Sequence, residues 1–141
     1  MTTNTTTVAG YSHVTVMVDD LDAAVTFYCD VLGFEVLPRP AEFGPGAWLQ
    51  VGSAQLHIGV VDRMPEKGRG LPHFALLVPA DVFDTTMAAL EERGIPFLMG
   101  PSARTDFGRP VRAAFIQDPS GNAIELPDVD PAPLSAPALP A

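Results

Sequence analysis

The chain contains two copies of one sequence pattern, and this internal repeat restricts its fold more than any other feature. The runs His13–Val18 and His73–Val78 are both short, apolar and opened by a histidine, and they lie about 60 residues apart. The triplet Leu56-His57-Ile58 ends the first copy where Ile124-Glu125-Leu126 ends the second. So short a duplication of mixed elements is not a solenoid, and it predicts two related modules that pack together.

Each copy predicts the element order βαβββ, because alternating apolar runs flank one stretch of helical spacing. In the first copy we expect a helix between Asp19–Asp22 and Gly33, and strands at Tyr11–Val18, Phe34–Leu37, Ala47–Val51 and Ala54–Val61. In the second we expect a helix at Val82–Arg93, a loop at Gly100–Pro110, and strands at His73–Val78, Ile95–Met99, Val111–Gln117 and Ala123–Pro127. The predicted fold class is α+β, with two βαβββ modules forming a cupped mixed sheet around a metal-binding cleft.

The repeat fills one domain of about residues 10–129, with modules at about 10–62 and 71–129. The threonine-rich residues 1–9 are expected to be a disordered N-terminal segment. Residues 130–141 contain four prolines in twelve positions, so they predict a disordered tail rather than a regular element.

The charge and cysteine content exclude several classes of function. A formal charge of −9, from 8 basic and 17 acidic residues, argues against partners such as nucleic acid or an anionic membrane surface. No apolar run approaches a membrane-spanning length, and the N-terminus lacks the pattern of a signal peptide. The single cysteine, Cys29, excludes an intramolecular disulfide. We expect a buried, inert thiol and a cytoplasmic protein.

Strand alternation places four candidate metal ligands on one side of the predicted sheets. His13 alternates with the packed residues Val14, Val16 and Val18, and His73 alternates with Phe74, Leu76 and Val78. The same parity sets His57 and Glu125 opposite the apolar side chains that must meet the helices. All three histidines of the chain therefore share a face with one carboxylate, although a single strand histidine is more often an ordinary core or surface residue.

Three imidazoles and a carboxylate suit one divalent ion, for which Fe, Zn, Ni, Co and Mn are all candidates. Four protein ligands leave one or two coordination positions open, which is what a catalytic site requires. The pattern therefore predicts a metal-dependent enzyme whose partner is a small molecule.

At this point the residues resemble those of the vicinal oxygen chelate superfamily, which includes glyoxalase I, bleomycin-resistance proteins, fosfomycin-resistance enzymes and extradiol dioxygenases. The segments that carry the resemblance are His13-Val-Thr-Val, Asp20–Tyr28, Val31-Leu-Gly-Phe34, Pro72-His73-Phe-Ala and Phe115–Leu126. The resemblance implies paired βαβββ modules, a homodimer and a divalent metal held by His13, His57, His73 and Glu125. It also implies that the metal binds neighbouring oxygens of the substrate.

The resemblance is less specific about the reaction. Glyoxalase I usually has a glutamate or glutamine in the slot of His57, so Glu125 is the candidate for proton transfer here. Extradiol dioxygenases ligate iron with residues that match His13, His73 and Glu125. The fosfomycin enzymes share a threonine at the position of Thr15, which makes Thr15 a candidate substrate-binding residue, but no basic cluster follows Glu125 in this chain. The expected activity is a lyase or isomerase, or an oxygenase; the alternative is a resistance protein that binds a drug or metabolite without turnover.

Several further residues are candidates for substrate binding. Trp48 and Phe107, with Met99, would line an apolar pocket, although core packing or a dimer contact is the alternative. Arg112, Arg104 and Arg109 would clamp an anionic substrate, and Arg112 is favoured because it lies within a strand.

Overall fold

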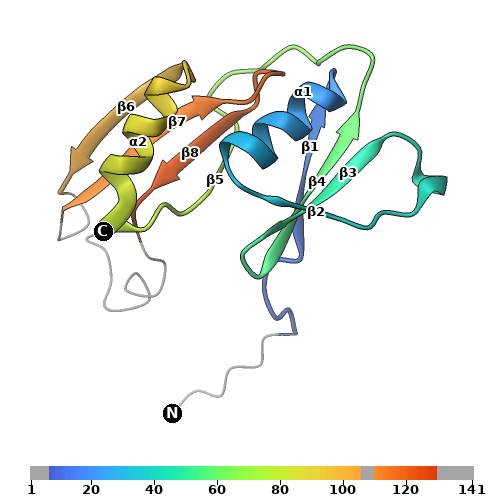
Figure 1. Cartoon of the computed structure of the whole chain (residues 1–141), viewed down its shortest axis with the longest axis horizontal. Coiled ribbons are helices and arrows are strands. Elements are labelled where there is room, and N and C mark those ends of the chain that lie inside the picture. Colours follow the sequence, from blue (N-terminus) through green and yellow to red (C-terminus); the bar gives the residue numbers. More distant parts are fainter. Residues whose placement is uncertain (1–6, 106–109, 130–141) are drawn as a thin grey trace. The chain divides into compact units, whose positions relative to one another are not determined.

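The structure of the chain is a computed structural model that describes residues 7–105 and 110–129. It separates into two compact units, which divide between Pro65 and Glu66. Each unit contains one four-stranded mixed sheet and a helical segment, so the α+β prediction of paired modules is confirmed (Figure 1). The predicted segments 1–9 and 130–141 lie wholly or mostly outside the described residues.

The first unit has the strand order β1-β4-β3-β2, in which β1 and β4 are parallel and the other neighbours are antiparallel. Its strands are β1 (His13–Val18), β2 (Glu35–Leu37), β3 (Gly46–Val51) and β4 (Ala54–Val60). Helix α1 (Leu21–Thr26) continues as a π-helical turn, Phe27–Val31, and a short 3-10 turn occupies Ala41–Phe43. The buried side chains of this unit include Val18, Ala24, Tyr28, Leu49 and Ile58.

The limits of the first helical segment follow from two local interactions. The Asp20 carboxylate accepts a hydrogen bond from the backbone N–H of Ala23 at 3.0 Å, which satisfies a donor that the first turn leaves unpaired. At the other end Gly33 has a φ of 82°, a conformation that glycine adopts without a steric penalty. Both ends agree with the sequence-based expectation.

The second unit has the strand order β5-β8-β7-β6, in which β5 and β8 are parallel, as β1 and β4 are in the first unit. Its strands are β5 (His73–Ala75), β6 (Phe97–Arg104), β7 (Val111–Gln117) and β8 (Ala123–Pro127). Helix α2 (Phe83–Glu92) follows a 3-10 turn at Ala80–Val82 and lies across this sheet (Figure 1). Phe83, Met87 and Leu90 of α2 are buried together with strand residues such as Ile116 and Ile124.

The two units repeat the same strand register. In the first, His13 is opposite Gln55 and Thr15 is opposite His57. In the second, His73 is opposite Ala123 and Ala75 is opposite Glu125. In both units the candidate ligand on the last strand is therefore paired with the residue two positions after the histidine of the first strand. Side chains two positions apart lie on one face, so each register brings two candidate ligands together.

Some predicted boundaries were wrong. The first strand begins at His13 rather than Tyr11, and β5 ends at Ala75, although Leu76 and Val78 still donate hydrogen bonds to β8. Val14 and Val60, which were expected to pack against the helix, are 37% and 36% exposed.

The largest correction concerns β6, which runs through residues 100–104 that were expected to form a loop. Its pairing with β7 shifts between Phe97 and Met99 and again between Met99 and Ser102. The second shift spans Gly100 and Pro101. Proline offers no N–H to the ladder and glycine often marks a bulge, so the strand signal was hidden at this point.

The turn before β8 depends on Asp118, which is 4% exposed. One carboxylate oxygen accepts the backbone N–H groups of Ser120 and Asn122, both at 2.9 Å, and the other accepts the Asn122 side-chain amide at 2.8 Å. This turn directs the chain into the strand that carries Glu125.

We expect Asp118→Ala to lower the free energy of unfolding by about 2–4 kcal/mol, because several charge-assisted hydrogen bonds at a buried position are lost. Denaturant unfolding monitored by circular dichroism measures this change. The exposed Asp62→Ala is the control, with an expected change within about 0.5 kcal/mol. Equal effects of the two substitutions would contradict the structural role of Asp118.

Cys29 is half-buried in the π-helical turn rather than fully buried as expected. Burial, and then the negative charge of Asp30, raise the pKa of its thiol above the ordinary value. A raised pKa reduces the thiolate fraction at neutral pH, and the thiolate is the reactive form.

We therefore expect the native protein to react with iodoacetamide at pH 7 more slowly than free cysteine, with a rate that rises steadily as the pH increases toward the raised pKa. Mass spectrometry at timed intervals measures the rate. Asp30→Asn should accelerate the reaction only slightly, because burial is the larger cause. A native rate equal to that of free cysteine would show that the thiol is not suppressed.

Candidate functional site

The second unit brings His73 and Glu125 into direct contact. His73 begins β5, Glu125 lies in the middle of β8, and the His73 Nε2 is 3.2 Å from the Glu125 Oε1. The other ring nitrogen, Nδ1, is 2.7 Å from the backbone carbonyl oxygen of Leu71. That carbonyl can only accept, so Nδ1 carries the proton and Nε2 is directed toward the carboxylate.

This pairing fits a metal ion. In the neutral ring Nε2 presents a lone pair to an oxygen that is also an acceptor, so the contact needs a proton or a cation between the two atoms. Two ligand atoms at about 2.1 Å from one ion, with an angle of 90–110° between them, are about 3.0–3.4 Å apart. The 3.2 Å separation of Nε2 and Oε1 lies within that range. The hydrogen bond to Leu71 is the kind that fixes the tautomer and orientation of a metal-binding histidine.

The first unit brings His13 and His57 together in a different manner. Their rings are stacked, with centroids 3.9 Å apart and planes 14° from parallel. Trp48 lies on β3, directly opposite His57 of β4. Its ring stacks on the other face of the His57 ring, with centroids 4.7 Å apart and planes 15° from parallel. We call His13, His57 and Trp48 the ring stack. The ring of Phe43 packs against that of Trp48 in a tilted arrangement, with centroids 5.9 Å apart.

Hydrogen bonds define which nitrogens of the ring stack remain available. The His57 Nε2 is 2.8 Å from the side-chain oxygen of Gln55, an acceptor, so Nε2–H donates and Nδ1 keeps its lone pair. The His13 Nδ1 is 3.1 Å from the Ser12 hydroxyl, which leaves Nε2 unengaged by that contact. Burial lowers the pKa of His57, and the neighbouring His13 and Arg39 lower it further. The lowered pKa favours neutral imidazole, which is the form that binds metal.

The stacked arrangement is not itself a chelating one. An imidazole lone pair lies in the plane of its ring, so two nearly parallel rings direct their lone pairs along parallel lines rather than toward one point. The donor atoms of the first pair therefore suit a metal, but at least one ring must rotate to bind it. Within residues 7–105 and 110–129, no three His, Cys, Asp or Glu side chains gather at metal-binding spacing. The structure brings the four predicted ligands together as two pairs, one in each unit.

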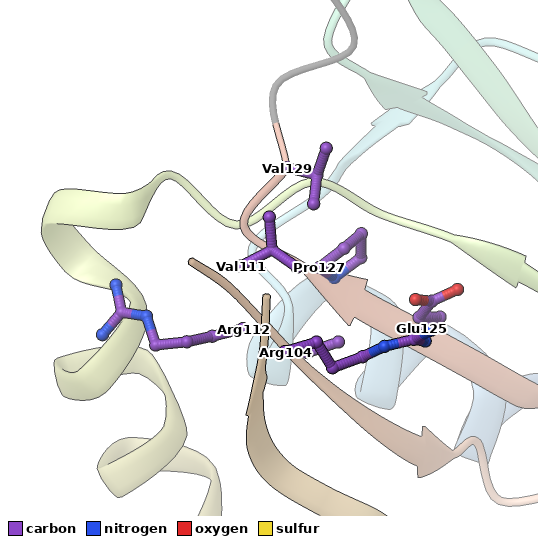
Figure 2. Close-up of a pocket in the computed structure, with 7 residues that line it drawn as sticks. Arg104, Val111, Arg112, Glu125, Pro127 and Val129 are labelled. Carbon is purple, nitrogen blue, oxygen red and sulfur yellow. The ribbon is translucent and has the colours of Figure 1, made fainter. Parts of the chain in front are cut away.

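A cavity of about 240 Å³ adjoins Glu125 in the second unit. Its lining includes three charged residues, Arg104, Arg112 and Glu125. The apolar residues of the lining include Val111, Ala113 and Pro127. Figure 2 shows that the Arg104 side chain extends toward Glu125, whereas the Arg112 side chain points in the opposite direction, toward the helix.

Arg112 is held on the helix side of the sheet. Its guanidinium donates to Asp128 at 3.0 Å, to Asp84 at 2.9 Å and to the Ala80 carbonyl at 2.7 Å. It also lies over the ring of Phe83, 4.6 Å from the centroid. The hydrogen bond to Asp128 and the charges of the two carboxylates raise its pKa. Binding of substrate by Arg112 stays a prediction, but each nitrogen of its guanidinium already donates to an acceptor within the protein.

The remaining predicted residues lie as follows. Thr15 is exposed on β1, opposite His57, and Trp48 belongs to the ring stack. Phe107 and Arg109 lie outside the described residues. Gln55 was not predicted, although its position two residues before His57 places it on the ligand face. The position of Arg104 could not be derived without knowing that β6 extends to it.

The ring stack makes a prediction for the metal-free protein in solution. His57 should titrate below the ordinary histidine pKa of about 6.5, and its ring protons should be shifted upfield by the adjacent rings. Trp48→Leu removes one of these rings and exposes His57, so its pKa should rise toward the ordinary value and the upfield shift should diminish. Proton NMR of the three histidines measures both effects. Titration of His57 at or above the ordinary pKa in the parent protein would contradict the stack.

Sequence comparison connects this geometry with known proteins. The model of the family described as Glyoxalase/Bleomycin resistance protein/Dioxygenase superfamily matches residues 10–126. A catechol-2,3-dioxygenase of Bacillus subtilis (strain 168) is 33% identical over 123 residues, which cover 83% of this chain. The chain spans only 40% of the length of that dioxygenase.

Solved structures show the same fold. A glyoxalase family protein of Bacillus anthracis is 28% identical, with a TM-score of 0.70 over 86% of this chain and 96% of its own. A lactoylglutathione lyase of Agrobacterium tumefaciens superposes with a TM-score of 0.67 over 86% of this chain and 95% of its own. At 21% identity, the second similarity concerns the fold alone.

Proposed function

The chain belongs to the Glyoxalase/Bleomycin resistance protein/Dioxygenase superfamily, and on that premise we propose that it is a metal-dependent enzyme for a small molecule with vicinal oxygens. The observation that carries the proposal is the His73–Glu125 pair. A 3.2 Å separation, a tautomer set by the Leu71 carbonyl and partial exposure of both side chains are what an open metal site requires. The superfamily includes dioxygenases and lyases, and the activity proposed here is of one of these two kinds.

In this proposal His73 and Glu125 supply two ligands and His13 and His57 supply the others, after the ring stack has opened. One divalent ion of Fe, Zn, Ni, Co or Mn fits this set of nitrogen and oxygen donors. When bound, the ion supplies a Lewis acid that stabilises negative charge developing on a substrate oxygen. The homodimer and the cytoplasmic location stay predictions; within the described residues, no helix is long and apolar enough to cross a membrane.

Glu125 is the residue proposed to move a proton. Its side chain is 26% exposed and adjoins the cavity, so it can reach a substrate while remaining partly screened from water. A carboxylate in this position can accept a proton from a substrate carbon or hydroxyl and return it to a neighbouring atom. In this proposal one carboxylate oxygen, Oε1, would bind the ion together with the His73 Nε2, and the other oxygen would be left for this task.

Metal binding is the first test. Protein purified without chelator, or reconstituted after chelation, should contain about one equivalent of a divalent metal per chain by elemental analysis. Glu125→Gln and His73→Ala should each weaken metal binding by at least about 100-fold. Even the loss of a residue that only hydrogen-bonds to a metal ligand lowers metal affinity by about 10–100-fold. Glu92→Gln, an exposed substitution on α2, is the matched control and should change nothing. Uptake below about a tenth of an equivalent would refute the proposal.

Turnover distinguishes the two kinds of enzyme from a binding protein. An oxygenase should consume oxygen with a catechol only when supplied with Fe(II), whereas a lyase or isomerase should act without oxygen consumption and with other divalent ions. In either case His73→Ala should abolish activity together with metal. Tight ligand binding that survives His73→Ala, with no turnover, would instead identify a drug- or metabolite-binding protein.

A further inference from the structure

The side chain of Gln55 forms the hydrogen bond that orients the His57 ring. Its oxygen, Oε1, lies 2.8 Å from the His57 Nε2. The two residues are two positions apart on β4, so strand geometry places both side chains on the same face of the sheet. His13 is opposite Gln55 on the neighbouring strand β1. The glutamine is therefore part of the strand that carries one candidate ligand, and it is paired with the other candidate ligand of this unit.

The candidate histidines of the two units are oriented by different kinds of partner. In the second unit the His73 Nδ1 meets the backbone carbonyl of Leu71, two residues earlier in the chain. In the first unit the His57 Nε2 meets the side chain of Gln55, which is also two residues earlier. Nδ1 is bonded to the ring carbon that joins the side chain, so a main-chain acceptor can reach it. Nε2 lies at the far end of the ring and requires an acceptor on a long side chain.

The two contacts select opposite tautomers of the neutral ring. A backbone carbonyl oxygen or a side-chain amide oxygen can only accept, so the proton sits on the nitrogen that meets it. His73 therefore carries its proton on Nδ1 and keeps its lone pair on Nε2, whereas His57 carries its proton on Nε2 and keeps its lone pair on Nδ1. The nitrogen that binds a metal is the one that the hydrogen bond leaves without a proton. The two units thus offer different nitrogens to an ion.

The tautomer of His57 affects how tightly an ion can be bound. This step rests on the proposed function, because it assumes that His57 is a metal ligand. Without the acceptor on Gln55, the proton of neutral His57 would be shared between its two nitrogens, and part of the population would have Nδ1 blocked. Loss of a group that orients a metal-binding histidine lowers metal affinity by about 10–100-fold. A tautomer that is fixed before the ion arrives avoids this loss.

We propose that Gln55 is a positioning residue for metal binding, which holds His57 as the Nε2–H tautomer so that the ion binds to its Nδ1. His73 binds the same ion through its Nε2. Gln55 does not touch the ion and takes no part in proton transfer, because it acts through the His57 ring alone. An ion bound at Nδ1 lies closer to the backbone of β4 than one bound at Nε2, since Nδ1 is the nitrogen nearer the main chain.

Nitrogen–proton correlation NMR of the imidazole rings tests the tautomers on the metal-free protein. At about pH 8 the rings are neutral, and the parent should show His57 as Nε2–H and His73 as Nδ1–H. Gln55→Leu should convert His57 to a mixture of both tautomers and leave His73 unchanged. Gln55→Glu keeps an acceptor at this position and should keep the parent tautomer.

Gln50→Leu is the matched control for these variants. Gln50 is opposite Gln55 on β3, and its amide donates to the carbonyls of Gly52 and Ala54 at the turn between β3 and β4. The substitution therefore disturbs the same hairpin without removing the hydrogen bond to His57. We expect it to leave the tautomers of both histidines as they are in the parent.

Zinc binding tests the consequence for the ion. In the zinc-loaded parent the same NMR measurement should show the ion at Nδ1 of His57 and at Nε2 of His73. Competition with a chelating dye measures the affinity. Gln55→Leu should weaken zinc binding by about tenfold or more, whereas Gln55→Glu and the control Gln50→Leu should lose no affinity.

The measurements on the metal-free protein separate this proposal from the proposed function. If the protein takes up no zinc, the proposed function fails, but a His57 tautomer that changes in Gln55→Leu and not in Gln50→Leu still supports the positioning role of Gln55. A parent His57 protonated on Nδ1, or a tautomer indifferent to Gln55→Leu, would overturn the proposal. Zinc bound at Nε2 of His57, or parent affinity in Gln55→Leu, would also overturn it. Circular dichroism checks that each variant is folded, and Gln55→Met replaces the leucine variant if that one does not fold.

Discussion

The parallel pairing of the first and last strands in each unit is the constraint on which the candidate site depends. Thr15, two positions after His13, is opposite His57. Ala75, two positions after His73, is opposite Glu125. A shift of one residue in either pairing would send one ligand of the pair to the helix side of its sheet. The apolar residues that alternate with the ligands, such as Val16, Ile58 and Ile124, prevent such a shift because they must remain buried. The packing of each core therefore also fixes the geometry of its ligand pair.

The same register gives the two pairs different properties because the side chains differ. In the second unit an imidazole meets a carboxylate edge to edge, with the tautomer set by Leu71, and this arrangement is ready for a cation. In the first unit two imidazoles have no opposite charge to attract them, and they stack beneath Trp48. Burial, and then the neighbouring His13 and Arg39, lower the pKa of His57 and so favour its neutral form, but they do not direct its lone pair toward that of His13. Metal binding would then begin at the His73–Glu125 pair, and the cost of opening the ring stack would lower the affinity for the complete set.

Much of this arrangement could be predicted from the sequence. The alternation around His13, His57, His73 and Glu125 is regular, and the N-cap at Asp20 and the helix end at Gly33 have clear local signals. The extent of β6 could not be predicted, because Gly100 and Pro101 interrupt its pattern while pairing with β7 resumes beyond them. For that reason Arg104 was assigned to a loop. Arg112 was favoured for being in a strand, but only the pairing of β7 with β8 reveals which face it occupies. The ring stack depends on contacts between three strands, which local patterns do not specify.

The central proposal is that His13, His57, His73 and Glu125 are the protein ligands of a single divalent ion. X-ray absorption spectroscopy of the metal-loaded protein tests it most directly, because ring scattering counts the imidazoles around the ion. The account predicts a first shell of nitrogen and oxygen at about 2.0–2.2 Å with the outer scattering of three imidazoles. It also predicts that His57→Ala reduces this number to two. A shell made of oxygen alone, or one with a single imidazole, would contradict the claim.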